Sequence, residues 1–180
     1  MAWATEEQNK RYMPPLASGE EVWCQLFSEP AGGSDLAALR TRAERDGDDW
    51  IINGQKIWTS GADRADWIFC LVRTRTEGKK QEGITFVLID MDAGGVSVRP
   101  IELISGASPF CEVFLEDVKV PKSNVVGEVN DGWTVGKALL GYERSIIGRA
   151  IGSQITDAEG ALVTLARRHY GEPGGEALGD

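Results

Sequence analysis

Short β-rich runs separated by turn signals fill the centre of the chain, from about residue 19 to residue 128. Trp67 to Val72 is an almost continuous apolar run, and Ile84 to Ile89 is a second one. Asp46-Gly47-Asp48-Asp49 lies between two further runs, as expected for the turn of a hairpin. Many short strands at this spacing are typical of a sandwich or a barrel. We therefore predict an antiparallel β-barrel or sandwich for residues 19–128.

Two turn signals divide this region further. Asn53-Gly54 predicts a turn between a strand that contains Trp50 and a strand that contains Trp58. The runs Glu112 to Leu115 and Val118 to Val120 predict two separate final strands.

Helical patterns flank the β region on both sides. Thr5-Glu6-Glu7 supplies a hydroxyl cap and first-turn acids for a helix that we expect Pro14-Pro15 to close. Asp131 is placed to cap a second helix, and apolar residues then recur at helical spacing from Val135 to Leu165. After Tyr170 we expect a loop over residues 172–175. The fold class is therefore α+β, with a short N-terminal helix and a long C-terminal helix.

Composition excludes several functions. The chain has 180 residues, 19 Lys and Arg, 28 Asp and Glu, and a net charge of −9, which argues against nucleic-acid or anionic-membrane partners. The sequence has a single histidine, His169, near the C-terminus, which makes a serine–histidine–aspartate triad improbable. Three cysteines without a CxxC pair predict neither a metal site nor a disulfide framework but buried, reduced thiols. The sequence contains no apolar run long enough to span a bilayer and no secretory signal, so we expect a cytoplasmic or organelle-matrix location.

Two segments have residue types suited to binding a ligand. Gln25 to Asp35 runs from a predicted strand into a glycine-rich turn with hydroxyls on both sides, although it matches neither a Walker A loop nor a GxGxxG fingerprint. Trp58-Thr59-Ser60-Gly61 places an indole beside two hydroxyls, an arrangement that suits a flat polar heterocycle. Taken singly, the first segment is better explained as an ordinary loop, and the second as a core tryptophan at a strand end.

Together the two segments resemble the acyl-CoA dehydrogenase family. The matching motifs, which extend the resemblance over nearly the whole chain, are Glu29-Pro30-x-x-Gly33-Ser34-Asp35, Asn53-Gly54-x-Lys56-x-Trp58 and Glu116-Asp117-Val118-Lys119-Val120-Pro121. The resemblance implies three parts. Residues 1–18 would end an N-terminal helical domain, residues 19–128 would form the middle β-barrel domain, and residues 129–180 would start a truncated C-terminal helical bundle.

The resemblance also implies an FAD site. Its cofactor-binding residues would be Gln25, Phe27, Ser28, Gly33, Ser34, Trp58, Thr59 and Ser60. Ser28 would bond the pyrimidine edge of the flavin, and Trp58 would lie against the isoalloxazine. Ser60 would donate to flavin N5, with Thr59 as the alternative donor because the local order differs from the commoner Trp-Ile-Thr-Asn. Ser34 would lie where the cofactor meets acyl-CoA.

The helical segment Gly141-Tyr142-Glu143-Arg144 supplies the candidate catalytic base. The family's chemistry removes the α-proton of a thioester while hydride leaves the β-carbon, which requires a desolvated carboxylate. A minority of members, the isovaleryl-type enzymes among them, carry this Glu on the present helix directly before an Arg. The resemblance thus assigns Glu143 as base and Gly141, Tyr142 and Arg144 as substrate-binding residues. The alternatives are a base in a later segment and a solvated Glu143–Arg144 pair.

The implied function is FAD-dependent α,β-dehydrogenation of an acyl-CoA thioester, with electrons passed to an electron-transfer flavoprotein. The full-length form would be a homo-oligomer, a dimer or a tetramer. We expect the isolated chain to bind FAD weakly and to be incomplete for activity. Three alternatives remain open, namely an acyl-CoA oxidase, a flavin monooxygenase of the same architecture, and a cofactor-free truncated module that only associates with other subunits.

Overall fold

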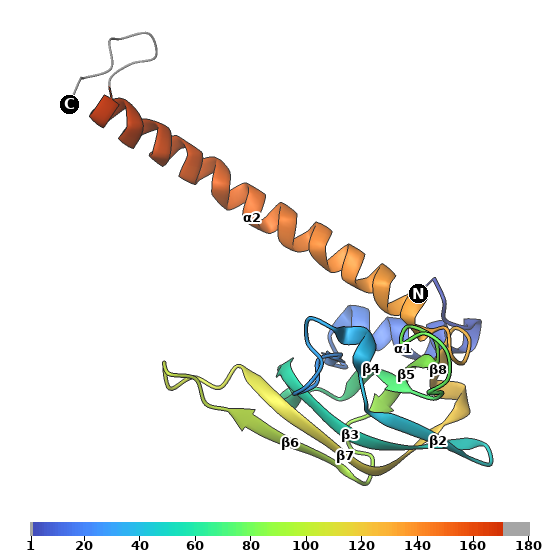
Figure 1. Ribbon diagram of the computed structural model, residues 1–180. Helices are drawn as coiled ribbons and strands as arrows, with labels where there is room; N and C mark the ends of the chain where they lie inside the picture. Colours follow the sequence, from blue (N-terminus) through green and yellow to red (C-terminus); the bar gives the residue numbers. More distant parts are fainter. Residues whose placement is uncertain (1, 171–180) are drawn as a thin grey trace. The chain divides into compact units, whose positions relative to one another are not determined.

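The computed structural model describes residues 2–170 (Figure 1). The chain divides into two compact units, Met1–Lys137 and Ala138–Asp180. The loop predicted for residues 172–175 lies outside the described residues.

The first unit is built on one mixed sheet of eight strands (Figure 1). The strands are β1 (Trp23–Leu26), β2 (Arg42–Asp46), β3 (Asp49–Ser60), β4 (Trp67–Arg73), β5 (Ile84–Asp90), β6 (Val96–Ile101), β7 (Phe110–Pro121) and β8 (Val125–Val126). Their order is β6-β7-β3-β2-β4-β5-β8, and β1 pairs with β4. Most pairs are antiparallel, which confirms the predicted β-domain, but β4 pairs in parallel with β1 and with the start of β2.

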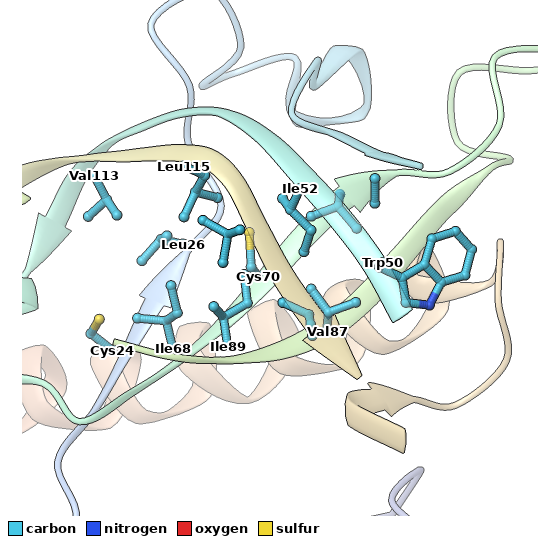
Figure 2. Close-up of a cluster of buried hydrophobic side chains, with 14 of the residues drawn as sticks. Cys24, Leu26, Trp50, Ile52, Ile68, Cys70, Val87, Ile89, Val113 and Leu115 are labelled. Atoms are coloured by element: carbon cyan, nitrogen blue, oxygen red, sulfur yellow. The ribbon is translucent and has the colours of Figure 1, made fainter. Parts of the chain in front are cut away.

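The core of this unit is formed mainly by alternating side chains from β1, β3, β4, β5 and β7, and it also includes Ala43 and Ala62 (Figure 2). Cys24, Cys70 and Cys111 are free and buried, as predicted. Burial raises the pKa of all three thiols, that of Cys24 to about 12 and that of Cys70 to about 11. Since the thiolate is the reactive form, these cysteines pack as small apolar residues.

Strand β3 does not turn at Asn53-Gly54, so that prediction is wrong. The strand continues from Asp49 to Ser60 and shifts register against β7 between Ile52 and Gly54. The Asn53 side chain donates to Asp117 Oδ1 and accepts from the Asp117 backbone N–H, both at 2.9 Å. These two bonds hold an irregularity within the sheet instead of a hairpin turn.

The last two predicted strands form one strand. β7 runs from Phe110 to Pro121 and passes through Asp117, whose φ is 51°. A non-glycine residue in this region usually marks a turn, but here the Asn53 side chain holds it inside a strand.

Helix α1 (Glu6–Ser18) begins where predicted and ends later than predicted. Thr5 and Gln8 form a capping box at its start, with bonds of 3.1 and 3.0 Å. Pro14 and Pro15 lie inside the helix, which ends at Gly19 in the left-handed conformation. The φ of proline is close to the helical value, so the backbone keeps its helical path here although each proline lacks an N–H donor.

The second helix, α2, spans Gly132–Tyr170. Its first turn packs in the first unit, because a Cβ on Gly132 would lie 2.3 Å from the backbone N of Phe86. Three 3-10 turns complete the described elements, Leu36–Ala38, Ala62–Arg64 and Lys122–Asn124. Neither helix of the described residues is long and apolar enough to cross a membrane.

Candidate functional site

The two ligand-binding segments predicted from the sequence lie side by side. The end of β1 continues into Phe27 and Ser28, and the backbone N–H of Ile57 in β3 donates to the Ser28 carbonyl at 2.9 Å. This bond brings Ser28 next to the end of β3, where Trp58 and Ser60 lie. Residues far apart in the sequence thus share one surface of the first unit.

Trp58 lies at a β-bulge with strained backbone. Its φ is 62°, and β3 contains one extra residue relative to β7 between Lys56 and Thr59. A bulky residue in this region is a rare outlier that its surroundings must hold in place. The indole is 55% exposed, and its nearest ring partner is Phe110, in an edge contact at 6.1 Å. The bulge therefore presents a large aromatic face to solvent.

The next two residues point to opposite sides. Thr59 is buried, and its hydroxyl has no hydrogen-bond partner among the described residues. Ser60 is exposed, as Trp58 is. The predicted pair of alternative donors is thus divided by burial, and Ser60 is the one whose side chain is exposed.

A buried ion pair lies beneath this surface. Lys56 Nζ is 2.9 Å from Glu29 Oε1, and it also donates to the carbonyls of Phe27 and Leu71 at 3.2 and 2.8 Å. Neither side chain is appreciably exposed. Although burial alone would raise the pKa of Glu29, the attraction of Lys56 and the accepted hydrogen bonds keep this pKa below its ordinary value. Glu29 is therefore a carboxylate at neutral pH.

The glycine-rich turn follows directly after Glu29. Glu29 and Gly32 exchange two backbone hydrogen bonds of 3.2 and 3.0 Å, which close a tight turn. Gly33 and Ser34 then lie exposed, and Asp35 is anchored to Lys80 at 2.7 Å. The exposed hydroxyl of Ser34 is available to a ligand.

Two other predicted cofactor residues have different surroundings. The Phe27 ring is buried and makes edge contacts with Phe69 and Phe86, each at 6.1 Å. Phe27 can therefore offer a ligand only its backbone. Gln25 lies half-buried in β1.

The predicted catalytic segment lies in the second unit. Gly141, Tyr142, Glu143 and Arg144 form one turn of α2, and the last three of these side chains are exposed. Trp58 and Ser28 belong to the first unit.

Lys56 and Glu29 lie in two of the sequence motifs, but no role was predicted for either residue. A signal for Lys56 was present in the alternation of β3, because the inward positions Trp50 and Ile52 predict that Lys56, in the same phase, also points inward. A buried lysine requires a buried acceptor, and Glu29 is that acceptor.

Comparison with known proteins identifies the family. The family model for the acyl-CoA dehydrogenase middle domain matches residues 24–118. The chain belongs to the acyl-CoA dehydrogenase family. This is a family of flavoprotein oxidoreductases.

Two curated relatives are acyl-CoA dehydrogenases of Mycobacterium tuberculosis. FadE34 is 48% identical over 155 residues, which are 85% of this chain and 22% of that protein. IpdE1 is 44% identical over 170 residues, which are 93% of this chain and 44% of that protein. The chain thus spans less than half the length of either relative.

Solved structures agree with the family assignment. The steroid acyl-CoA dehydrogenase Tcur3481-Tcur3483 has a TM-score of 0.81 and 41% identity, over 93% of this chain and 43% of that one. The ChsE4-ChsE5 complex from Mycobacterium tuberculosis has a TM-score of 0.73 and 40% identity, over 78% and 36%.

The residues present fit the FAD that the family implies. Trp58 offers an exposed flat aromatic face, and Ser60, two residues further along β3, adds an exposed hydroxyl. Such a surface can accommodate a flat, mostly apolar ring with polar edges, which describes the flavin of FAD.

Proposed function

We propose that this chain is the flavin-binding middle part of an enzyme that dehydrogenates an acyl-CoA thioester between its α and β carbons. The observation that carries the proposal is Trp58, which a strained bulge holds exposed beside Ser60 and which the Ile57–Ser28 bond ties to the glycine-rich segment. Such strain persists where the surrounding structure holds it, and it is common at ligand sites.

In this proposal each residue has a separate task. Trp58 lies against the flavin, Ser60 donates to it with Thr59 as the alternative, and the backbone from Gln25 to Ser28 lines its polar edge together with Gly33. Ser34 lies between FAD and acyl-CoA. FAD, when bound, accepts the two electrons that the substrate loses.

Glu143 is the proposed base that takes the α-proton, with Gly141, Tyr142 and Arg144 binding the substrate around it. We also propose the domain division 1–18, 19–128 and 129–180, in which the outer parts belong to helical domains.

The test of the flavin site is FAD binding by Trp58→Ala in the assembled protein, followed by flavin absorbance or tryptophan fluorescence. Losing a stacked aromatic pair costs about 0.5–1.5 kcal/mol beyond the lost area, so FAD should bind several-fold to about tenfold more weakly. Trp3→Ala is the matched control, because Trp3 is 40% exposed and lies outside the site. Equal FAD affinity in the wild type and in Trp58→Ala would refute the proposed site.

The substrate class that we propose is a steroid-derived acyl-CoA. The support is the similarity to Tcur3481-Tcur3483, which is described as a steroid acyl-CoA dehydrogenase. The test compares flavin bleaching by a steroid acyl-CoA with bleaching by a straight-chain acyl-CoA. Faster bleaching by the straight-chain thioester would refute this class.

The proposed electron acceptor is an electron-transfer flavoprotein, and the proposed setting is a bacterial cytoplasm. An acyl-CoA oxidase would instead form peroxide without a protein acceptor, so a peroxide assay separates the two functions. We propose that the chain works as an oligomer. Because the related ChsE4-ChsE5 structure is described as a complex, the mass of the assembled protein should be measured with and without a second type of chain.

A further inference from the structure

We propose that the buried Glu29–Lys56 pair is the positioning element of the flavin site. The pair fixes the backbone that carries Ser28 on one side and Trp58 on the other. This inference rests on the proposed function. It assigns a role to two residues that act on the cofactor only through their neighbours.

The ammonium group of Lys56 connects three segments of the chain. It has three N–H donors and three acceptors, which are Glu29 Oε1 at 2.9 Å, the Leu71 carbonyl at 2.8 Å and the Phe27 carbonyl at 3.2 Å. Phe27 directly precedes Ser28, and Lys56 lies two residues before Trp58. The amine therefore ties both halves of the site to β4.

The carboxylate of Glu29 completes the network. Glu29 Oε2 accepts from the Arg40 backbone N–H at 2.6 Å, and Glu29 Oε1 accepts from the Thr41 backbone N–H at 2.9 Å. These contacts hold the end of the segment that begins at the Glu29–Gly32 turn. The segment carries Gly33 and Ser34, so one residue sets its start through backbone bonds and its end through the carboxylate.

Stability alone gives no reason for charges at this place. A well-packed apolar pair is often as stabilising as a buried ion pair, or more so, because two charges must lose their water. The fully buried neighbours Leu26, Ile52 and Leu71 are apolar and pack without such a cost. What a fully bonded pair adds is directional geometry, and the strained φ of Trp58 needs neighbours that hold it.

The experiment separates positioning from stability. The double variant Glu29→Gln/Lys56→Met removes both charges and keeps similar volumes, and it is compared with the wild type and with Lys56→Met. Lys119→Met is the matched control, because Lys119 pairs at 3.0 Å with Asp49 at the start of β3, and its side chain is 63% exposed. For each assembled protein we would measure the midpoint of thermal unfolding and the affinity for FAD. We would also measure the visible spectrum and the reduction potential of the bound flavin.

We expect Lys56→Met to lose stability, because it leaves the Glu29 carboxylate buried and unpaired. The double variant should recover most of that stability. It should still bind FAD about 10- to 100-fold more weakly, which is the loss of affinity seen at metal sites when a residue that supports a ligand by hydrogen bonding is removed. Its flavin spectrum and potential should also shift. A double variant with recovered stability and wild-type affinity, spectrum and potential would overturn the proposal.

Two further measurements cover the remaining outcomes. If the double variant does not fold, Glu29→Gln replaces it, because it removes the ion pair and one backbone hydrogen bond while its amide oxygen keeps the other, and FAD affinity, spectrum and potential should again shift from those of the wild type. If the wild type binds no FAD, the proposed function fails, and amide exchange tests the positioning instead. The Ile57 and Thr41 amides should then exchange at least about tenfold faster without the pair, and unchanged exchange would overturn the inference.

Discussion

Each residue of the Asn53-Gly54-x-Lys56-x-Trp58 motif has its own physical task. Asn53 holds the Asp117 backbone, Gly54 leaves room for a neighbouring chain segment, and Lys56 pairs with Glu29. Of these four, Trp58 is the residue whose exposed side chain we propose as a ligand contact. At the residue scale most of the motif therefore builds the support for one functional side chain.

Gly54→Ala tests the room left for that segment. A Cβ at this position would lie 2.5 Å from Thr41 Oγ1 and 2.7 Å from Thr41 Cα, and the backbone cannot move away as a flexible side chain could. Overpacking of this kind typically costs about 1–3 kcal/mol, so the free energy of unfolding in urea should fall by that amount.

Gly94→Ala is the control for this substitution, because a Cβ there meets nothing within 4 Å. We expect it to change stability by less than about 0.5 kcal/mol. If Gly54→Ala is no less stable than Gly94→Ala, close packing of Thr41 is not the reason for the glycine.

At the scale of elements, the predictions succeeded where the hydrophobic pattern of a segment is unambiguous. β4 and β5 are short, nearly continuous apolar runs, so each strand was predicted close to its observed bounds. The predictions failed at Asn53-Gly54 and at Pro14-Pro15, because local turn or break signals were overridden there. A cross-strand contact with Asp117 kept β3 continuous, and the helical φ of proline allowed α1 to continue.

The candidate site was predictable only in part for a related reason. The motifs located Ser28, Trp58 and Ser60 in the sequence, but the sequence could not tell which hydroxyl of Thr59-Ser60 is exposed. One extra residue in β3 decides this, because a shift of one position turns every following side chain to the other face.

Docking of α1 onto the sheet depends on an aromatic cluster. Tyr12 is buried and makes edge contacts with Trp23 and Trp67, at centroid distances of 5.3 and 5.0 Å. Truncating a buried aromatic side chain costs about 3–5 kcal/mol, so Tyr12→Ala should destabilise the first unit on this scale. Hydrogen exchange should also accelerate throughout α1.

Tyr142→Ala provides the matched comparison for α1. Tyr142 is 68% exposed on α2, and its loss should leave the free energy of unfolding within about 0.5 kcal/mol of the wild type. Similar effects of the two tyrosine variants in urea unfolding would contradict the proposed anchoring role of Tyr12.

At the scale of the whole molecule, the proposed chemistry needs residues from both compact units. Trp58 and Ser60 belong to Met1–Lys137, whereas Glu143 belongs to Ala138–Asp180. The exposed apolar side chains of α2, Tyr142, Ile146 and Ile147, surround Glu143 in sequence. If further protein covers them in the assembled enzyme, the Glu143 carboxylate is shielded from water beside the substrate, as a general base at carbon requires.

Glu143→Gln tests this assignment in the assembled enzyme. The amide keeps the size and hydrogen bonding of the carboxylate but cannot take a proton, so the variant should bind FAD and acyl-CoA as the wild type does. Loss of a general base typically costs about 10²–10⁴-fold, and the rate of flavin reduction in stopped flow should fall on that scale. Glu116→Gln is the control, because Glu116 is an exposed residue of β7. Wild-type reduction by Glu143→Gln would place the base in a later segment and leave Glu143 a solvated helix residue.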